Sequence, residues 1–226
     1  MEDKTNKMKK MTHSKSVRTI LLTIVALISL NLTGFSQEEE KQVKVLISTE
    51  YGDMTAVLYN ETPLHRDNFV KITKEGWYDD SPFHRIIEGF MIQGGMNADG
   101  RRDPGYTVPA EFDTKLFHKK GALCAARTNN PEKASSGSQF YIVQGKSYPA
   151  DQIPMMGQRS GITYTEEQIE AYSTIGGTPQ LDGAYTVYGE VIEGLEVIDK
   201  LAAVETAPGD KPVKDVTMKI TIIEEN

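Results

Sequence analysis

Short apolar runs separated by turns dominate the middle and the end of this chain of 226 residues. Residues Val43 to Thr49 are rich in β-branched side chains, and Met54 to Tyr59 form a second run after the turn sequence Tyr51-Gly52-Asp53. β-Branched residues favour strands, so the pattern predicts a hairpin at the start of the domain. The last run, Val216 to Ile223, alternates between apolar and polar positions, which indicates a strand with one buried face. We expect it to pair with the first strand and close the sheet.

Helical patterns occur in three places. Thr62-Pro63 can begin a helix, with Thr62 as the cap and the proline at the first helical position, and Gly76 can end it. Residues Gly194 to Ala202 repeat apolar side chains at helical spacing. A third, short helix should begin at the capping box Thr165 to Gln168. Many short strands with few helices predict a mainly β fold, in the form of a closed antiparallel barrel.

The segment from Phe83 to Gly95 combines apolar residues with polar groups that are costly to bury. It holds His84, Arg85 and Gln93 among Ile, Phe and Met side chains, and it ends in two glycines. Glycines in this position allow a close approach between two backbone segments. An isolated His-Arg pair usually lies at a solvated edge, but this mixture is typical of the wall of a pocket.

The charge and the cysteine and histidine content limit the partners of the chain. The formal net charge is −7, and residues 37–226 carry 19 basic and 30 acidic groups, a formal charge of −11. Binding to a nucleic-acid backbone needs clustered cations, so we expect no nucleic-acid partner. The single cysteine, Cys124, can form no internal disulfide and should be a small buried residue. The four histidines lack the spacing of a metal site, so we expect no bound metal.

Residues 1–36 have the three parts of a secretory signal peptide. Basic residues come first, and the apolar run from Ile20 to Leu32 follows, with 13 residues against the roughly 20 that span a bilayer. Gly34 and Ser36 then provide the small residues of a cleavage site. We expect a periplasmic or secreted protein in which residues 37–42 form a flexible lead-in. The alternative is an uncleaved signal that anchors the chain in the membrane.

Three sequence blocks follow one another in a fixed order: Phe83 to Gly95, Ser138 to Ile142 and Leu181 to Gly183. Together they resemble the cyclophilins, a family of peptidyl-prolyl cis-trans isomerases. The resemblance extends from about Val43 to Glu224. It implies a closed eight-stranded antiparallel barrel with one helix at each open end.

The chain departs from the cyclophilin pattern within the predicted domain, residues 43–226. The family makes the connection between residues 145 and 179 with a short loop, whereas here the segment is long and contains the predicted third helix. Because this insertion lies just before Leu181, we expect it to border the mouth of the pocket.

Isomerisation of an X-Pro bond requires no covalent chemistry. Rotation breaks amide resonance, at a barrier of about 20 kcal/mol, and the prolyl nitrogen regains its lone pair. A catalyst therefore needs an apolar slot for the ring and a donor near that nitrogen, and it needs no nucleophile, metal or cofactor. The resemblance implies that Arg85 is this donor. It assigns His84 a supporting role in the shape and hydrogen bonding of the pocket.

The resemblance also implies which residues form the slot. Phe90 and Met91 match the family's proline slot, and Leu181 matches its aliphatic wall. Tyr141 replaces the usual phenylalanine of the floor, and its hydroxyl should make the slot more polar. Tyr185 stands where many relatives have histidine, so an aromatic contact is kept.

A second group should bind the backbone of the substrate. Gln93 and Gln139 match amides that contact the peptide. Ala126, Arg127 and Thr128 match the strand edge along which the peptide lies, although the family often has Ala-Asn-Ala there. We therefore expect proline-containing polypeptides as partners.

Two classes of function remain open. The first is an exported prolyl isomerase, and the second is a non-catalytic proline-binding chaperone or assembly module that uses the same groove. The intact Arg85, Gln93 and Gln139 favour the isomerase, while the long insertion leaves room for the binding module. A third class, a hydrolase, finds no support, because the sequence has no G-x-S-x-G motif and no plausible Cys-His arrangement. We expect a monomer that contacts a membrane only through an uncleaved signal.

Overall fold

The computed structural model describes residues 41–100 and 103–225. The predicted signal peptide, residues 1–36, lies outside this range, as do residues 37–40 of the predicted lead-in. Residues 41–226 form one compact unit. Among the described residues, no helix has the length and apolar composition needed to cross a bilayer.

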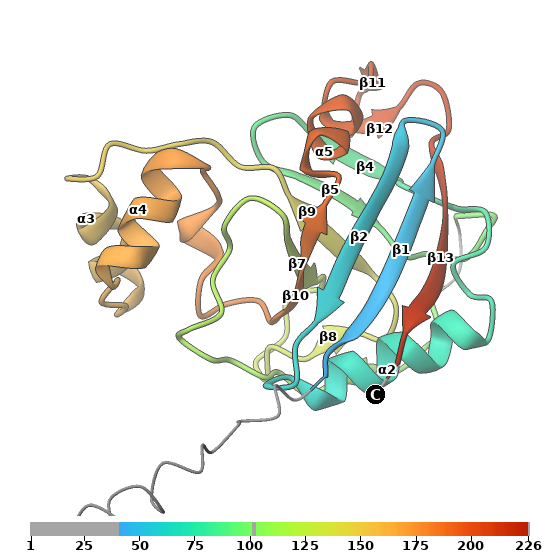
Figure 1. Cartoon of the computed structure of the whole chain (residues 1–226), viewed down its shortest axis with the longest axis horizontal. Coiled ribbons are helices and arrows are strands. Elements are labelled where there is room, and N and C mark those ends of the chain that lie inside the picture. The colour runs from blue at the N-terminus through green and yellow to red at the C-terminus, as the bar shows by residue number, and fades with distance from the viewer. Residues whose placement is uncertain (1–40, 101–102, 226) are drawn as a thin grey trace, which may run out of the picture. The chain divides into compact units, whose positions relative to one another are not determined.

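Strand residues outnumber helix residues in this unit (Figure 1). The strands are β1 (Val43–Thr49), β2 (Gly52–Leu58), β3 (Ser81–Pro82), β4 (Arg85–Ile87), β5 (Met91–Gly94), β6 (Thr107–Val108), β7 (Ala122–Ala125), β8 (Ser135–Ser136), β9 (Phe140–Val143), β10 (Val187–Glu193), β11 (Thr206–Ala207), β12 (Lys211–Pro212) and β13 (Thr217–Glu224). The helices are α2 (Pro63–Lys74), α3 (Ile153–Ser160), α4 (Glu166–Thr174), α5 (Leu195–Ala202) and the 3₁₀ turn η1 (Pro179–Leu181). Figure 1 shows α2 and α5 at opposite ends of the sheet, with α3 and α4 beside it.

Nine strands form one antiparallel sheet in the order β3-β13-β1-β2-β10-β7-β9-β5-β4. β1 pairs with both β2 and β13, as the sequence predicted. The sheet curls, but its end strands β3 and β4 do not pair with each other. The closed eight-stranded barrel is therefore not confirmed, and the fold is a mainly β, curled and open antiparallel sheet.

The two end strands of the sheet follow each other directly in the chain. Between them, Phe83 donates its N–H to the carbonyl of Val216, next to β13, at 2.8 Å. His84 then donates its N–H to the carbonyl of Gln93 in β5, at 3.0 Å. The segment 81–87 thus changes hydrogen-bonding partner halfway along, which explains why one continuous piece of chain forms two separate end strands.

Helix α2 begins with Pro63 in its first turn, as predicted, but a different residue caps it. The Thr62 side chain makes no capping hydrogen bond. Instead, the Glu111 carboxylate accepts hydrogen bonds from the N–H groups of Leu64 and His65, at 3.0 and 2.9 Å. The prediction of Thr62 as the cap was wrong, because a carboxylate interacts more strongly than a hydroxyl with the free N–H groups of a helix N-terminus.

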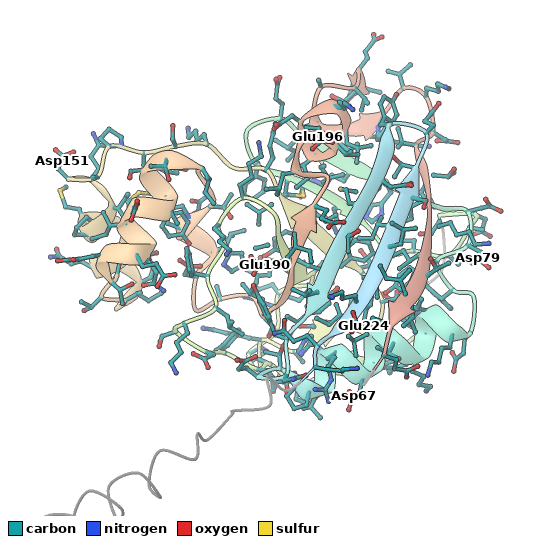
Figure 2. The ribbon with its side chains drawn as sticks, in the orientation of Figure 1. Asp67, Asp79, Asp151, Glu190, Glu196 and Glu224 are labelled. Carbon is teal, nitrogen blue, oxygen red and sulfur yellow. The ribbon has the colours of Figure 1, made fainter. Side chains whose placement is uncertain are left out.

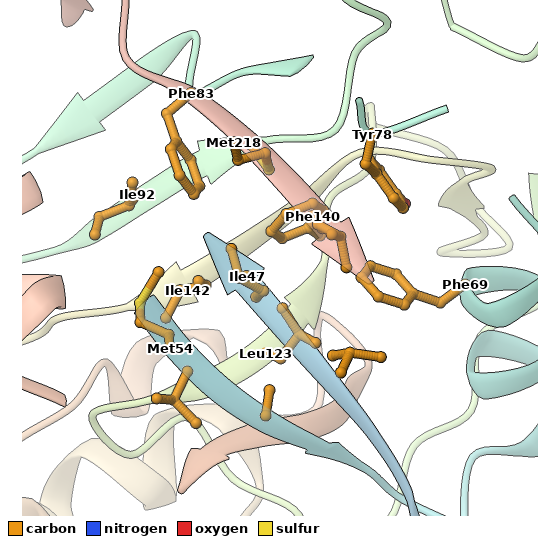
Figure 3. Close-up of a cluster of buried hydrophobic side chains, with 14 of the residues drawn as sticks. Ile47, Met54, Phe69, Tyr78, Phe83, Ile92, Leu123, Phe140, Ile142 and Met218 are labelled. Carbon is orange, nitrogen blue, oxygen red and sulfur yellow. The ribbon is translucent and has the colours of Figure 1, made fainter. Parts of the chain in front are cut away.

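An aromatic cluster fills the core between α2 and the sheet (Figure 3). The ring centroids of Phe69 and Tyr78 lie 5.0 Å apart, and the ring of Phe140 in β9 lies 5.7 and 5.6 Å from them. Such aromatic pairs add about 0.5–1.5 kcal/mol each beyond the burial of their area. The Tyr78 hydroxyl donates to the carbonyl of Ser138 at 2.9 Å, so its polar end is satisfied. Side chains alternate along a strand, so Tyr141 lies on the opposite face of β9 from this core.

Gly95 allows the close backbone approach that the sequence predicted. A Cβ atom on Gly95 would lie 2.3 Å from the carbonyl oxygen of Ser138, and φ is +93°. We expect Gly95→Ala to lower the free energy of unfolding by about 3 kcal/mol, through crowding and an unfavourable φ. Gly89→Ala is the control, since Gly89 has φ +73° but no atom within 4 Å of the added Cβ, and it should cost about 1 kcal/mol. Equal losses in urea unfolding would contradict the role of crowding.

The predicted insertion, residues 145–179, contains two helices instead of one. α4 starts at the predicted capping box, in which Gln168 N–H donates to Thr165 Oγ1 and Thr165 N–H donates to Gln168 Oε1. α3 was not predicted from the sequence, which shows Pro154 next to its first residue. A proline in the first turn of a helix removes an N–H that has no partner in the helix, so it is tolerated there.

The base of the insertion is a narrow backbone junction. Gly177 forms isolated β-bridges to Lys119 and to Lys146, which lie on either side of it. A Cβ atom on Gly177 would lie 2.3 Å from the carbonyl oxygen of His118, so only glycine fits this approach. Beyond this junction, the insertion has its own buried apolar cluster of Ile153, Tyr164 and Tyr172.

Acidic side chains come from many parts of the described domain (Figure 2). Those labelled lie in or next to α2, β10, α5, β13 and the insertion. They are Asp67, Asp79, Asp151, Glu190, Glu196 and Glu224. This distribution agrees with the acidic composition, and the lack of a nucleic-acid partner stays a prediction.

Candidate functional site

One pocket, with a volume of about 110 Å³, brings together nine of the twelve residues predicted from the resemblance. Its lining consists of Arg85, Phe90, Met91, Gln93, Ala126, Arg127, Tyr141, Leu181 and Tyr185. The other three predicted residues, His84, Thr128 and Gln139, do not line it.

The register of the sheet explains why residues distant in sequence meet at this pocket. Arg85 of β4 is paired with Gln93 of β5, which is paired with Tyr141 of β9, which is paired with Cys124 of β7. Residues directly opposite one another in neighbouring strands present their side chains on the same face. The guanidinium, the amide and the aromatic ring therefore lie in one row, on the face of the sheet away from the aromatic core.

Arg85 stands at the open end of this row, with 43% of its side chain exposed. Its Nε lies 3.3 Å from Oδ2 of Asp210, in the turn between β11 and β12. The carbonyl of Asp210 also accepts the N–H of Ile86 at 2.8 Å, so backbone and side chain both fix this turn beside β4. The sequence analysis missed Asp210. The residues Pro208-Gly209-Asp210 are typical of a turn, but nothing local indicates which strand the turn lies against.

The two predicted amides contact each other at the edge of the pocket. Gln93 Nε2 donates to Gln139 Oε1 at 3.3 Å, and Gln139 Nε2 donates to Asp103 Oδ2 at 3.2 Å. Asp103 also accepts a hydrogen bond from the Ser136 hydroxyl at 2.6 Å. Asp103, which was not predicted, therefore orients Gln139, and Gln139 in turn orients Gln93.

Arg127 covers one side of the pocket. Its guanidinium carbon lies 4.6 Å from the centroid of the Tyr185 ring, and its Nε donates to the carbonyl of Ala184 at 3.0 Å. A cation at this distance from an aromatic face is attracted to it. Thr128, by contrast, is exposed and does not belong to the lining of the pocket.

His84 lies next to Arg85 in the chain but outside the lining of the pocket. Among the described residues, no side chain or backbone group pairs with its buried Nδ1 atom. Burial lowers the pKa of His84, and the neighbouring charge of Arg85 lowers it further. The imidazole is therefore held in its neutral form at pH 7.

The stability of the protein should depend on the protonation of two histidines. Burial lowers the pKa of both His65 and His84 from the ordinary value of 6.5, although Glu111 opposes the shift at His65. The unfolded chain then binds protons at a higher pH than the folded chain does. We expect the free energy of unfolding to fall as the pH drops from about 6.5 through the lowered pKa values. Urea unfolding between pH 7.5 and 5 measures this loss. The slope should be smaller in His84→Gln, and an unchanged slope would contradict the assignment.

Tyr141 forms the floor of the pocket, but its hydroxyl does not make the slot more polar. The side chain is 4% exposed, and its hydroxyl lies 2.9 Å from Nε2 of the buried His118. His118 in turn contacts Asp182 through Nδ1 at 2.6 Å. The expectation of a polar slot was wrong, because the hydroxyl has a buried partner behind the floor. Neither His118 nor Asp182 was predicted as part of the site.

Cys124 is buried, as predicted. Burial raises the pKa of its thiol well above the ordinary value of 9.0, so it stays protonated and unreactive. Among the described residues, no group of three or more His, Cys, Asp or Glu side chains is arranged to hold a metal ion.

Comparisons with known proteins agree with this geometry. The family model for cyclophilin type peptidyl-prolyl cis-trans isomerase/CLD matches residues 44–222. A protein of Staphylococcus aureus (strain USA300) named as a peptidyl-prolyl cis-trans isomerase is 36% identical over 192 residues, which cover 83% of this chain and 94% of that protein. A protein of the same name from Staphylococcus epidermidis gives the same values.

Solved structures show the same fold. The crystal structure of a Cryptosporidium parvum cyclophilin type peptidyl-prolyl cis-trans isomerase has a TM-score of 0.63 and 25% identity, and covers 82% of this chain and 100% of that one. A second crystal structure of that protein, in the presence of the dipeptide Ala-Pro, has a TM-score of 0.61 and covers 80% and 99%. The match of the family model, the identity to the bacterial relatives and the shared fold establish that this chain belongs to the cyclophilin-type peptidyl-prolyl cis-trans isomerases.

Proposed function

We propose that the pocket binds the proline of a polypeptide and that Arg85 stabilises the X-Pro bond in its twisted form. The observation that carries this proposal is the row of paired residues Arg85, Gln93 and Tyr141. It places a cation, an amide and an aromatic floor on one face of the sheet and around one pocket.

The chemistry follows from the change in charge on the prolyl nitrogen. In the planar amide the lone pair of this nitrogen is delocalised, and in the twisted amide it is localised and can accept a hydrogen bond. The Nε of Arg85 is directed to Asp210, which leaves the two terminal amino groups of the guanidinium for the pocket. A donor that binds the twisted form more strongly than the planar form lowers the barrier.

The other pocket residues hold the substrate in place. Phe90, Met91, Leu181 and the Tyr141 ring surround the proline, since these are the apolar groups of the lining. Gln93 presents its amide to the peptide backbone, supported from outside the lining by Gln139.

The strand edge at Arg127 provides a second contact with the substrate. Among the described residues, neither the N–H nor the C=O of Arg127 forms a hydrogen bond with another backbone group. An extended peptide can pair with such an edge. The Ala-Pro dipeptide named with the Cryptosporidium parvum structure supports proline-containing polypeptides as substrates here too.

We also propose that the protein is exported, as the basic and apolar segments within residues 1–36 indicate.

A further proposal is that the sheet closes into a barrel. Phe83 bonds to Val216 next to β13, and His84 bonds to Gln93 in β5, so this short segment connects the two ends of the sheet and supports closure.

A protease-coupled assay tests the catalytic proposal. The purified protein is added to a chromogenic peptide that contains Ala-Pro, and cleavage of the trans form reports the rate of isomerisation. We expect acceleration in proportion to protein concentration. Binding of the peptide without acceleration would overturn the proposal and would favour the non-catalytic binding module.

A further inference from the structure

A buried carboxylate connects the insertion with the floor of the pocket. Asp182 follows η1 and is buried. Its Oδ1 lies 2.9 Å from the backbone N of His118 and 2.6 Å from Nδ1 of the same residue. Its Oδ2 accepts a hydrogen bond from the hydroxyl of Tyr172 at 2.5 Å, and it lies 2.9 Å from the hydroxyl of Tyr164, which is also 3.0 Å from the carbonyl of Pro179. Four donors therefore converge on one carboxylate, and two of them belong to the insertion.

The direction of each hydrogen bond follows from this arrangement. An ionised carboxylate only accepts hydrogen bonds, so Nδ1 of His118 carries a proton and donates it to Asp182. In the neutral imidazole the other nitrogen, Nε2, is then an acceptor. When the imidazole is neutral, the hydroxyl of Tyr141, 2.9 Å away, donates to this nitrogen. Burial raises the pKa of Tyr141 well above its ordinary value of 10.0, so this hydroxyl keeps its proton.

The backbone fixes this connection as firmly as the side chains do. The carbonyl of His118 accepts the N–H of Thr178 at 2.8 Å, and Lys120 donates its N–H to the carbonyl of Gly176 at 2.9 Å. Tyr172 of α4 is fully buried. The last residues of the insertion therefore run beside the segment that carries His118, and the position of the imidazole depends on the insertion.

We propose that Asp182 and His118 are positioning residues, through which Tyr164 and Tyr172 of the insertion keep the Tyr141 hydroxyl out of the proline slot. This proposal rests on the function proposed above, in which Tyr141 is the floor of that slot. The insertion thus sets the affinity of the slot for proline without contacting the substrate.

The alternative positions of the Tyr141 hydroxyl show why it needs this partner. Its other polar neighbour is the thiol of Cys124, which is a weak acceptor. Without His118 in place, the hydroxyl would either lack a strong acceptor or turn toward the slot. A polar group facing the proline ring would have to be desolvated on binding, which lowers the affinity for substrate.

A double-mutant cycle tests the proposal. Tyr172→Phe removes one donor to Asp182 and keeps the ring, and we expect it to lower kcat/KM for an Ala-Pro peptide about 5-fold, through KM. The same substitution in a Tyr141→Phe background should change kcat/KM by less than about 1.5-fold, because no floor hydroxyl is left to position. Equal losses in the two backgrounds would overturn the proposal, and so would no loss in either.

Two further variants sharpen this experiment. Tyr148→Phe is the matched control, because Tyr148 belongs to the same insertion and packs beside the same buried cluster but does not contact Asp182. It should leave kcat/KM within about 1.5-fold of the wild type. Asp182→Asn keeps the shape of the side chain, but the amide accepts hydrogen bonds through one oxygen only. The effect of this substitution on kcat/KM should also disappear in the Tyr141→Phe background.

A spectroscopic measurement is independent of activity. The ¹⁵N resonances of the His118 ring in the purified protein should identify the neutral tautomer with the proton on Nδ1, and Tyr172→Phe should shift them. A proton on Nε2 instead would overturn the proposal even if the enzyme is active. If the wild type shows no isomerase activity but the Nδ1 tautomer is present, the proposed function fails while the hydrogen-bonded connection stands.

Discussion

Arg85→Ala is expected to lower kcat/KM for an X-Pro peptide by at least about 100-fold, which corresponds to about 2.7 kcal/mol of transition-state stabilisation. The guanidinium is the cationic group of the row of paired residues that lines the pocket, and Asp210 fixes its Nε at 3.3 Å. Alanine removes the donor to the prolyl nitrogen and leaves the apolar slot in place. The loss should therefore appear mainly in kcat, measured in the protease-coupled assay.

Two variants control for this substitution. Arg85→Lys keeps the charge but loses the planar fork that contacts Asp210 and the substrate together, so it should recover only part of the rate. Lys211→Ala removes a cation one residue from Asp210 and outside the pocket lining, and should change the rate less than 2-fold. A folded Arg85→Ala protein with the wild-type rate would refute the role assigned to this residue.

Asp182→Ala is expected to lower the free energy of unfolding by about 4 kcal/mol. The substitution removes the acceptor of the two N–H groups of His118 and of the Tyr172 hydroxyl, all of them buried, while the Tyr164 hydroxyl keeps the carbonyl of Pro179 as an acceptor at 3.0 Å. Each buried donor that loses its partner costs about 1–3 kcal/mol. Urea unfolding monitored by circular dichroism measures the change.

Asp215→Ala is the matched control for this measurement. Asp215 pairs with Lys211 at 3.8 Å, but both side chains are mostly exposed, and exposed pairs contribute about 0–1 kcal/mol. We therefore expect a change of less than about 1 kcal/mol. If the two alanine variants had the same free energy of unfolding, the carboxylate of Asp182 would have no structural role. Asp182 would then not connect the insertion with the pocket.

The pocket lining could be predicted because the resemblance to the cyclophilins lies in short, contiguous motifs. Arg85, Phe90, Met91 and Gln93 belong to one such motif, which the structure folds as the hairpin of β4 and β5. The strands of the first hairpin and the capping box of α4 could be predicted because their signals are local.

The residues that were missed depend on partners far away in the chain. Asp210 lies 125 residues from Arg85, and Asp182 lies 64 residues from His118. Glu111 caps α2 from a distance of 46 residues, which is why the adjacent threonine was taken for the cap. Such contacts depend on the register of the whole sheet, which no local pattern contains. The open sheet likewise could not be predicted, because strand pairing on the two sides of Phe83 changes partner within one extended segment.

The segment that holds both ends of the sheet has a consequence for the order in which the protein folds. Phe83 bonds to Val216, which follows 133 residues later in the chain, and Arg85 lies two residues after Phe83. Pairings between such distant residues form late in folding. We therefore expect the segment that carries Arg85 to become fully ordered only in the last steps of folding, after β13 has paired with β1 and β3.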